Sequence, residues 1–202
     1  MSKPADRRAP GKLLALRRVS GHLDDLTDES LVAASATGDD AAVGALYDRH
    51  SRAVYRFVSR LMGVAEADLD DVVSATFIEA SRSFARFRGG SSVLTWLMGI
   101  AVNVVRHHVR GAWRRRVLLD QYRWLPRPQS APGPDVFTEQ RELIERQQGV
   151  LDALPHDLKV AFVMCDVEEI PCSKVAVALG VREGTVWKRL YRARRVLGSA
   201  LE

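Results

Sequence analysis

The sequence predicts an all-α protein made of two small helical domains joined by a proline-rich flexible linker. Apolar residues recur at three- and four-residue steps, as on the buried face of a helix, whereas the alternating pattern of a strand is scarce. Four of the eight prolines fall within Pro126–Pro134, where a helix is not sustained. We therefore expect a basic flexible tail at 1–23, domains at 24–116 and 139–202, and a mobile spacer at 117–138.

In the first domain, helix start and stop signals stand beside each apolar periodicity. They predict helices over 29–38, from Asp39 or Asp40 to Gly63, over 67–85, and over 93–115, with Asp28 capping the first and Ser91 or Ser92 the fourth. The stretch "RFRGGSS" separates the last two helices, because its glycines and serines do not favour a helix.

The second domain is predicted to contain helices near 138–152 and 156–166 and two short helices across 172–197. Within "SKVAVALGVREGTVWKRLYRARRVL", Ala176, Gly180 and Val186 fall at the spacing of a helix-turn-helix. The small Ala176 lets the helices cross closely, and Gly180 supplies the positive φ of the turn. Val186 then packs the second helix back onto the first.

The charge of this motif points to nucleic acid. Six bases and one acid lie between Arg182 and Arg195, and a helix in the major groove needs cations for base edges and phosphates. If Val186 faces inward, Trp187, Lys188 and Arg192 face outward. We assign Lys188 and Arg192 to base or phosphate contacts, and Arg182 and Arg195 to phosphates. The alternatives are an ordinary solvated basic helix and, for Trp187, a core or subunit contact.

The charge is also uneven along the chain. Residues 1–23 carry six bases and one acid, residues 24–80 four bases and twelve acids, and residues 81–202 twenty bases and twelve acids. The acidic stretch suits a basic protein partner and the later stretch a polyanion. Solvated helix faces of either sign are the alternative explanation.

Several classes of protein are not supported by the composition. No apolar run reaches the length of a membrane span, and the basic N-terminus lacks the apolar core of a signal peptide, so we expect a cytoplasmic protein without membrane insertion. Cys165 and Cys172 are too few for a disulfide framework and are expected to be buried, inert thiols rather than a redox or zinc site.

No catalytic or cofactor motif is apparent. The sequence has no phosphate loop, metal cluster or nucleophile–base pairing, so we predict neither an enzyme nor a cofactor. The adjacent His107 and His108 do not suggest a metal site, because neighbouring helical residues point about 100° apart.

Five stretches follow one another along the chain: "DESLVAASATGDDAAVGALYDRH", "DLDDVVSATFIEA", "FRGGSSVLTWLMGIAVNVVRHHVRGAWRRR", "LDALPHDLKVAFVMCDVEEIP" and "GTVWKRLYRARRVL". In this order they resemble the extracytoplasmic-function (ECF) sigma factors of bacterial RNA polymerase. The resemblance covers about 28–116 and 140–201. It implies an alternative sigma factor that binds core RNA polymerase, reads the −35 element as duplex and the −10 element as single strand, and promotes melting and initiation. It also implies an anti-sigma partner. The competing hypothesis is an autonomous helix-turn-helix regulator with an N-terminal sensor or dimerisation domain.

The resemblance assigns polymerase docking to the predicted helix 67–85. The residues implied are Asp68, Asp70, Asp71, Val72, Ser74, Phe77 and Ile78. Ser74 and Ala75 depart from the family pattern, which has Gln and an acid there. Losing those two groups is expected to weaken docking by roughly 1–3 kcal/mol, provided that both made desolvated contacts.

The −10 element is assigned to the loop "FARFRGGSS" and the helix after it. The residues implied are Phe84, Arg86, Phe87, Arg88, Ser91, Ser92, Trp96, Asn103, Arg106, His107 and Arg110. A flipped base is held by stacking and edge hydrogen bonds, for which aromatic, cationic and hydroxyl groups are suited. A plain helix connector is the alternative for the loop, whereas Trp96 is expected to be a core or pocket wall rather than a free stacking platform.

The −35 element is assigned to the helix-turn-helix. The residues implied are Lys174, Arg182, Thr185, Trp187, Lys188, Arg189, Arg192 and Arg195. Lys174 stands where the family has an acid, which strengthens phosphate attraction at this point.

Overall fold

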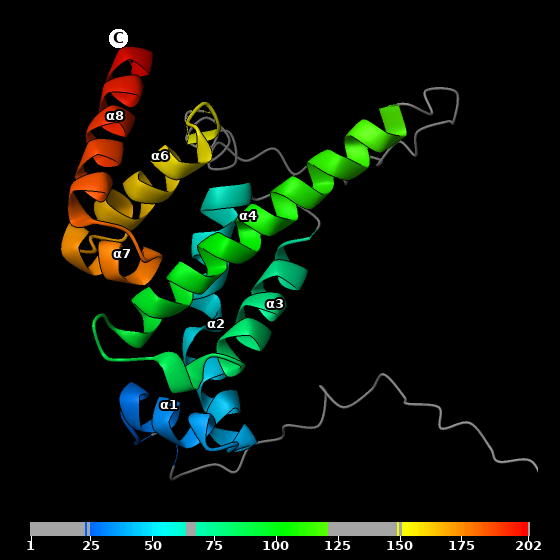
Figure 1. Cartoon of the computed structure of the whole chain (residues 1–202), viewed down its shortest axis with the longest axis vertical. Coiled ribbons are helices and arrows are strands. Elements are labelled where there is room, and N and C mark those ends of the chain that lie inside the picture. The colour runs from blue at the N-terminus through cyan, green and yellow to red at the C-terminus, as the bar shows by residue number, and fades with distance from the viewer. Residues whose placement is uncertain (1–22, 24, 64–67, 121–148, 150, 202) are drawn as a thin grey trace, which may run out of the picture.

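The computed structural model describes residues 23, 25–63, 68–120, 149 and 151–201 of the 202-residue chain. Within these ranges every regular element is a helix, so the all-α prediction is confirmed there. Figure 1 shows α4 as a long diagonal helix with α6, α7 and α8 gathered beside it. No helix in the described part combines the length and apolar character that crossing a bilayer requires. The predicted tail, most of the linker and most of the helix near 138–152 lie outside the described residues.

The N-terminal unit contains the four predicted helices and one short turn. These are α1 (Asp28–Ala36), α2 (Asp40–Met62), α3 (Leu69–Ser81) and α4 (Val93–Asp120), with the 3₁₀ turn η1 (Phe84–Arg86) between the last two. Asp39 caps α2, because its carboxylate accepts hydrogen bonds from the backbone N–H groups of Ala41 (2.9 Å) and Ala42 (3.2 Å). The helix ends at Gly63, whose φ of 104° suits glycine.

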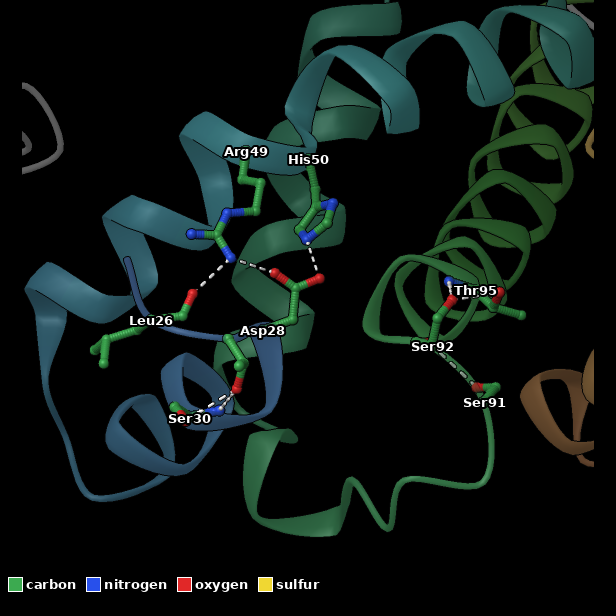
Figure 2. A network of polar contacts seen from close by, with 9 residues as sticks. Leu26, Asp28, Ser30, Arg49, His50, Ser91, Ser92 and Thr95 are labelled. Carbon is green, nitrogen blue, oxygen red and sulfur yellow. Dashed lines mark hydrogen bonds and ion pairs between the residues drawn. The ribbon is translucent and has the colours of Figure 1, made fainter. Parts of the chain in front are cut away.

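The cap of α1 differs from the prediction. Thr27, rather than Asp28, is the N-cap, and its hydroxyl accepts from the backbone N–H of Ser30. The carboxylate of Asp28 instead binds Arg49 of α2 at 2.6 Å and His50 at 2.8 Å (Figure 2). Asp28 therefore ties α1 to α2, a long-range role that the local sequence did not reveal.

The ends of α3 and α4 also differ from expectation. The α3 helix ends at Ser81, and the hydroxyl of Ser83 donates to the carbonyl of Glu79 at 2.7 Å before η1 begins. Ser92 caps α4, accepting from the backbone N–H of Thr95 at 3.1 Å (Figure 2). The α4 helix then continues to Asp120, beyond the predicted end at 115 and into the predicted linker.

The C-terminal unit contains α6 (His156–Phe162), the π-helical turn η2 (Val163–Val167), α7 (Cys172–Leu179) and α8 (Glu183–Leu201). Gly180 adopts φ 64° between α7 and α8, while Ala176 and Val186 are buried, as the helix-turn-helix prediction requires. The prediction of two short helices is wrong for α8. Ala193 and Leu197 extend its buried face against Leu154, so the helix continues to Leu201.

The two units pack against each other, whereas the sequence suggested two bodies separated by a spacer. Their buried side chains form one continuous apolar cluster, and α7 lies on α4. At the crossing, a Cβ added to Gly99 would stand 2.5 Å from the carbonyl oxygen of Ala178. Glycine at position 99 therefore permits the backbones of α4 and α7 to approach closely. A second contact joins the two units through α6 and α2, where the Lys159 ammonium donates to the carbonyl of Leu61 at 3.3 Å.

Replacing Gly99 with alanine is expected to separate the two units. Alanine favours a helix over glycine by about 1 kcal/mol, so α4 itself stays folded, but the new methyl group clashes with rigid backbone of α7. Small-angle scattering should show a larger radius of gyration for G99A, with unchanged helical circular dichroism. The matched control is G44A in α2, where an added Cβ meets nothing within 4 Å. Equal radii for G99A, G44A and the unmodified chain would contradict the prediction.

Candidate nucleic-acid interface

The α3 helix presents an acidic, partly apolar outer face. Asp70, Asp71 and Ser74 are exposed, and the Ile78 side chain is 40% exposed. Asp68 is partly exposed and lies 3.2 Å from Nε2 of His108 on α4. These residues remain available to a partner, as predicted from the sequence.

Two of the predicted docking residues are not available in this way. Val72 and Phe77 are buried, and the Phe77 ring packs edge-on against Tyr47 of α2 at 4.8 Å. We therefore correct their assignment. They hold α3 against the core and so orient the carboxylates that the same helix exposes.

A groove of about 860 Å³ lies between α3 and α4 and brings predicted residues of both kinds together. Its lining includes Asp71, Ile78, Arg86, Trp96, Asn103 and His107. Ala178 of α7 also lines it. The carboxylate of Asp71, from the predicted docking face, thus stands beside the aromatic and polar side chains predicted to read single-stranded DNA.

The loop before α4 supplies fewer exposed side chains than the sequence suggested. Phe84 is only 2% exposed, with its ring 5.7 Å from that of Trp96, so it is a core residue and not a surface for a base. Ser91 is also buried, and Ser92 is committed to the cap of α4. Arg86 and Arg88 are exposed.

Trp96 forms part of the wall of the groove. Phe87 packs against it edge-on at a ring separation of 5.4 Å, and Phe84 contacts it from the core side. The indole is half-buried, which favours a pocket wall over a free stacking platform.

One carboxylate links the two predicted DNA surfaces. Asp157 of α6 binds Nη2 of Arg106 on α4 at 3.0 Å through one oxygen and Nη2 of Arg189 on α8 at 2.8 Å through the other. Arg106 is a predicted −10 contact and Arg189 a predicted −35 contact. Sequence reasoning missed Asp157, since its only local signal is an acid at the start of a predicted helix.

Lys174 on α7 also contacts the N-terminal unit. Its ammonium, predicted to approach −35 phosphates, donates to the carbonyl of Gly90 in the loop before α4 at 3.0 Å. Asn103, Arg106, Arg110 and Arg189 meanwhile line a cavity of about 240 Å³ between the units. Predicted DNA contacts from both units therefore face one another.

The α8 helix exposes a basic and aromatic face. Lys188, Arg192 and Arg195 are exposed, and Trp187 is 53% exposed, so the predicted outward orientation of Trp187 is confirmed. Its indole N–H donates to Glu183 at 3.4 Å. Tyr191, 64% exposed, lies on the same helix and was not singled out from the sequence. Arg182 is exposed at the turn, and Thr185 is partly covered.

Comparisons with known proteins agree with this geometry. Residues 46–115 match Sigma-70 region 2, and residues 148–197 match Sigma-70, region 4. Together with the helix-turn-helix, the two matches define a bacterial transcription initiation factor of the sigma-70 class.

The full-length relatives specify the family. The chain is 32% identical over 191 residues to the ECF RNA polymerase sigma factor SigE of Mycolicibacterium smegmatis, covering 87% of this chain and 73% of that protein. It is 30% identical over 191 residues to the ECF RNA polymerase sigma-E factor of Haemophilus influenzae, covering 89% and 97%. The chain therefore belongs to the ECF RNA polymerase sigma factors. This membership supports sigma factor function over that of an autonomous regulator.

Solved structures show the same fold. The structure of CnrH in complex with the cytosolic domain of CnrY is similar with a TM-score of 0.61 and 26% identity, covering 86% of this chain and 96% of that one. The sigma factor RpoE from Bartonella quintana, solved with the anti-sigma factor NepR, is similar in fold with a TM-score of 0.54 and 20% identity, covering 77% and 93%.

Removing the charge of Asp157 is expected to release arginines for DNA. Each partly exposed ion pair contributes about 0.2–1 kcal/mol, so D157N should bind nonspecific duplex DNA up to roughly tenfold more tightly than the unmodified chain. The slope of log affinity against log salt should steepen by about 1–2, because two more cations reach phosphates. Fluorescence anisotropy on labelled duplex measures both quantities. D48N, which removes the same charge from the exposed surface of α2, is the control, and equal gains in both variants would contradict the prediction.

Acid is expected to destabilise the fold through His156, the residue before Asp157. Burial first, and then Arg106, lower the pKa of His156 below its ordinary value, with Lys159 and Arg110 adding to this and Asp157 opposing it. Its Nε2 is buried without a partner among the described residues. A lowered pKa means that the unfolded chain binds more protons, so stability present above pH 6.5 is lost as the pH falls below it.

Urea unfolding at pH 7.5 and pH 5.5 tests this expectation. His156 contributes at most about 1.4 kcal/mol per pH unit, and H156Q should remove that share of the loss. H107Q, at an exposed position on α4, should leave the loss unchanged. If H156Q and the unmodified chain lose the same free energy of unfolding, His156 does not carry the effect.

Proposed function

We propose that the N-terminal unit, 24–116, docks on core RNA polymerase and captures the −10 element, while the C-terminal unit, 139–202, reads the −35 element. Residues 117–138 then serve as the linker between them. In this role the protein is not an enzyme and acts in the cytoplasm, where RNA polymerase works. Melting follows from capture of bases that are already unstacked, which is a difference in binding free energy between two states of the DNA.

Polymerase docking is assigned to the outer face of α3. Asp70 and Asp71 supply charge for a basic surface, and Ile78 supplies apolar area at the next turns. The short Ser74 on this face supports the expectation of weaker or redistributed contacts than in relatives with a longer polar side chain.

Capture of the −10 strand is assigned to the groove between α3 and α4. Trp96 forms an apolar wall beside which a flipped base would lie, while Asn103 and His107 offer hydrogen bonds to its edges. Arg86 in the groove lining and the exposed Arg88 in the loop beside it suit the flanking phosphates.

The observation that carries the −35 assignment is the sidedness of α8. Val186, Leu190 and Ala193 are buried, whereas Lys188, Arg192 and Arg195 on the other side are exposed together with Trp187. A helix held by its apolar face behind a tight turn, with cations outward, fits the major groove.

Promoter binding then requires the two units to separate. In the packed arrangement Asp157 holds Arg106 and Arg189 against each other, and Lys174 is held by the loop at Gly90. These groups cannot contact phosphates on two distant promoter elements while they pair across one interface. Polymerase docking supplies the free energy for separation, because a ligand shifts an equilibrium by its differential affinity for the two states.

We also propose an anti-sigma partner for this chain. CnrH was solved with the cytosolic domain of CnrY, and the Bartonella RpoE with the anti-sigma factor NepR. A partner of this kind would act by holding the packed arrangement or by covering the exposed face of α3.

Run-off transcription with core polymerase on genomic fragments tests the assignments. The double reversal D70K/D71K should lower core binding roughly 100-fold, since two charge-assisted contacts are each worth about 1–3 kcal/mol.

The double substitution K188A/R192A should leave core binding intact but lower transcript yield at least tenfold, because base contacts carry about 1–3 kcal/mol each. D40K/D48K, a reversal of two exposed acids on α2, is the matched control. Failure of the unmodified chain to direct start-site selection would overturn the proposal.

A further inference from the structure

The two cysteines of the chain meet in the C-terminal unit. Cys165 lies in η2 and Cys172 begins α7, and their sulfur atoms are 3.4 Å apart. Both are free thiols. The seven-residue spacing in the sequence did not predict this contact, because it depends on the turn between η2 and α7.

That turn is well defined by backbone hydrogen bonds. The N–H of Glu168 donates to the carbonyl of Val163 at 2.9 Å, and the N–H of Ile170 donates to that of Met164 at 3.0 Å. Glu169 adopts φ 55°, the left-handed conformation that reverses the chain. Both sulfur atoms are therefore positioned by the fold rather than by chance contact of long side chains.

The pair is also accessible. Cys165 and Cys172 line a surface cavity of about 480 Å³, together with Trp187 and Arg194. Cys165 is half-buried and Cys172 is 8% exposed. Cys165 is therefore the more exposed of the two thiols, and the sulfur of Cys172 lies 3.4 Å from its own.

We propose that Cys165 and Cys172 are a modification site that forms a reversible intramolecular disulfide by exchange with a small-molecule disulfide. The Cys165 thiolate attacks one sulfur of the small disulfide and releases one small thiol. The Cys172 thiolate then attacks the mixed disulfide at Cys165 and releases the second small thiol. Two protein thiols are oxidised by two electrons, one small disulfide is reduced to two thiols, and the two protein protons end on the released thiolates.

The environment makes this exchange slow rather than fast. Burial, followed by the hydrogen bond with Cys172, raises the pKa of Cys165 to about 12, with Asp166 adding to this effect and Arg194 opposing it. The reactive thiolate is therefore the minor form of Cys165 at neutral pH. Exchange is therefore slow, so the pair responds to sustained rather than brief exposure to a small disulfide.

Thiol counting on the folded, full-length chain tests the proposal. The chain is held in excess oxidised glutathione, alkylated with iodoacetamide under denaturing conditions, and analysed by intact mass and nonreducing gel. We expect a monomer ~2 Da lighter that takes up no alkyl group and regains both thiols with reduced glutathione. C165S and C172S should each yield no such species, and should stop at one glutathione adduct or one free thiol.

Two physical readouts accompany the chemistry. A closed loop of this size should raise the melting midpoint by about 4–8 °C, and reduction should reverse the shift. Trp187 fluorescence should fall on oxidation because the indole lines the same cavity, and W187F should remove that change while retaining the mass change.

Persistence of two alkylatable thiols, accumulation of a stable mixed disulfide, or covalent dimers in place of the oxidised monomer would each overturn the proposal. Because thiol counting requires neither polymerase nor DNA, its outcome is independent of the proposed promoter contacts.

Discussion

The close crossing of α4 and α7 is the constraint on which the rest of the structure depends. Gly99 permits it, because any side chain there would meet the carbonyl of Ala178. Once the backbones touch, the buried side chains of two small helical units merge into one cluster. Small units bury a limited fraction of their surface when alone, so this shared burial stabilises both of them. The crossing also sets which polar groups face one another, including Asp157, Arg106 and Arg189.

The same surfaces therefore serve two incompatible purposes. In the packed arrangement, cations assigned to the promoter pair with the carboxylate of Asp157 or donate to the backbone carbonyl of Gly90. On a promoter, the same cations would lie against phosphates on elements far apart. Apolar burial between the units makes their separation unfavourable, and each ion pair adds a small amount to the free energy that separation requires. The proposed function therefore requires the larger free energy of docking on polymerase to separate the two units before promoter DNA is bound tightly.

The sequence predicted those features that depend on neighbours along the chain. Helical periodicity gave the four N-terminal helices, and Gly180 with Val186 gave the helix-turn-helix and the outward face of α8. Features that depend on distant partners were not predictable. Phe84 reads as an exposed aromatic beside arginines, yet it is buried against Trp96. Asp157 and the pair of cysteines acquire their roles only when the chain brings remote groups within bonding distance.

A distance between the two units, measured with and without core polymerase, tests the central claim most directly. Spin labels at Ser81 on α3 and Ser173 on α7, in a chain with both native cysteines replaced by serine, report that distance without touching the assigned DNA contacts. We predict one narrow distribution for the free chain and a shift of tens of Å on binding polymerase, within the reach of a linker of about 20 extended residues. A broad distribution in the free chain, or the same narrow distribution in both states, would contradict this account.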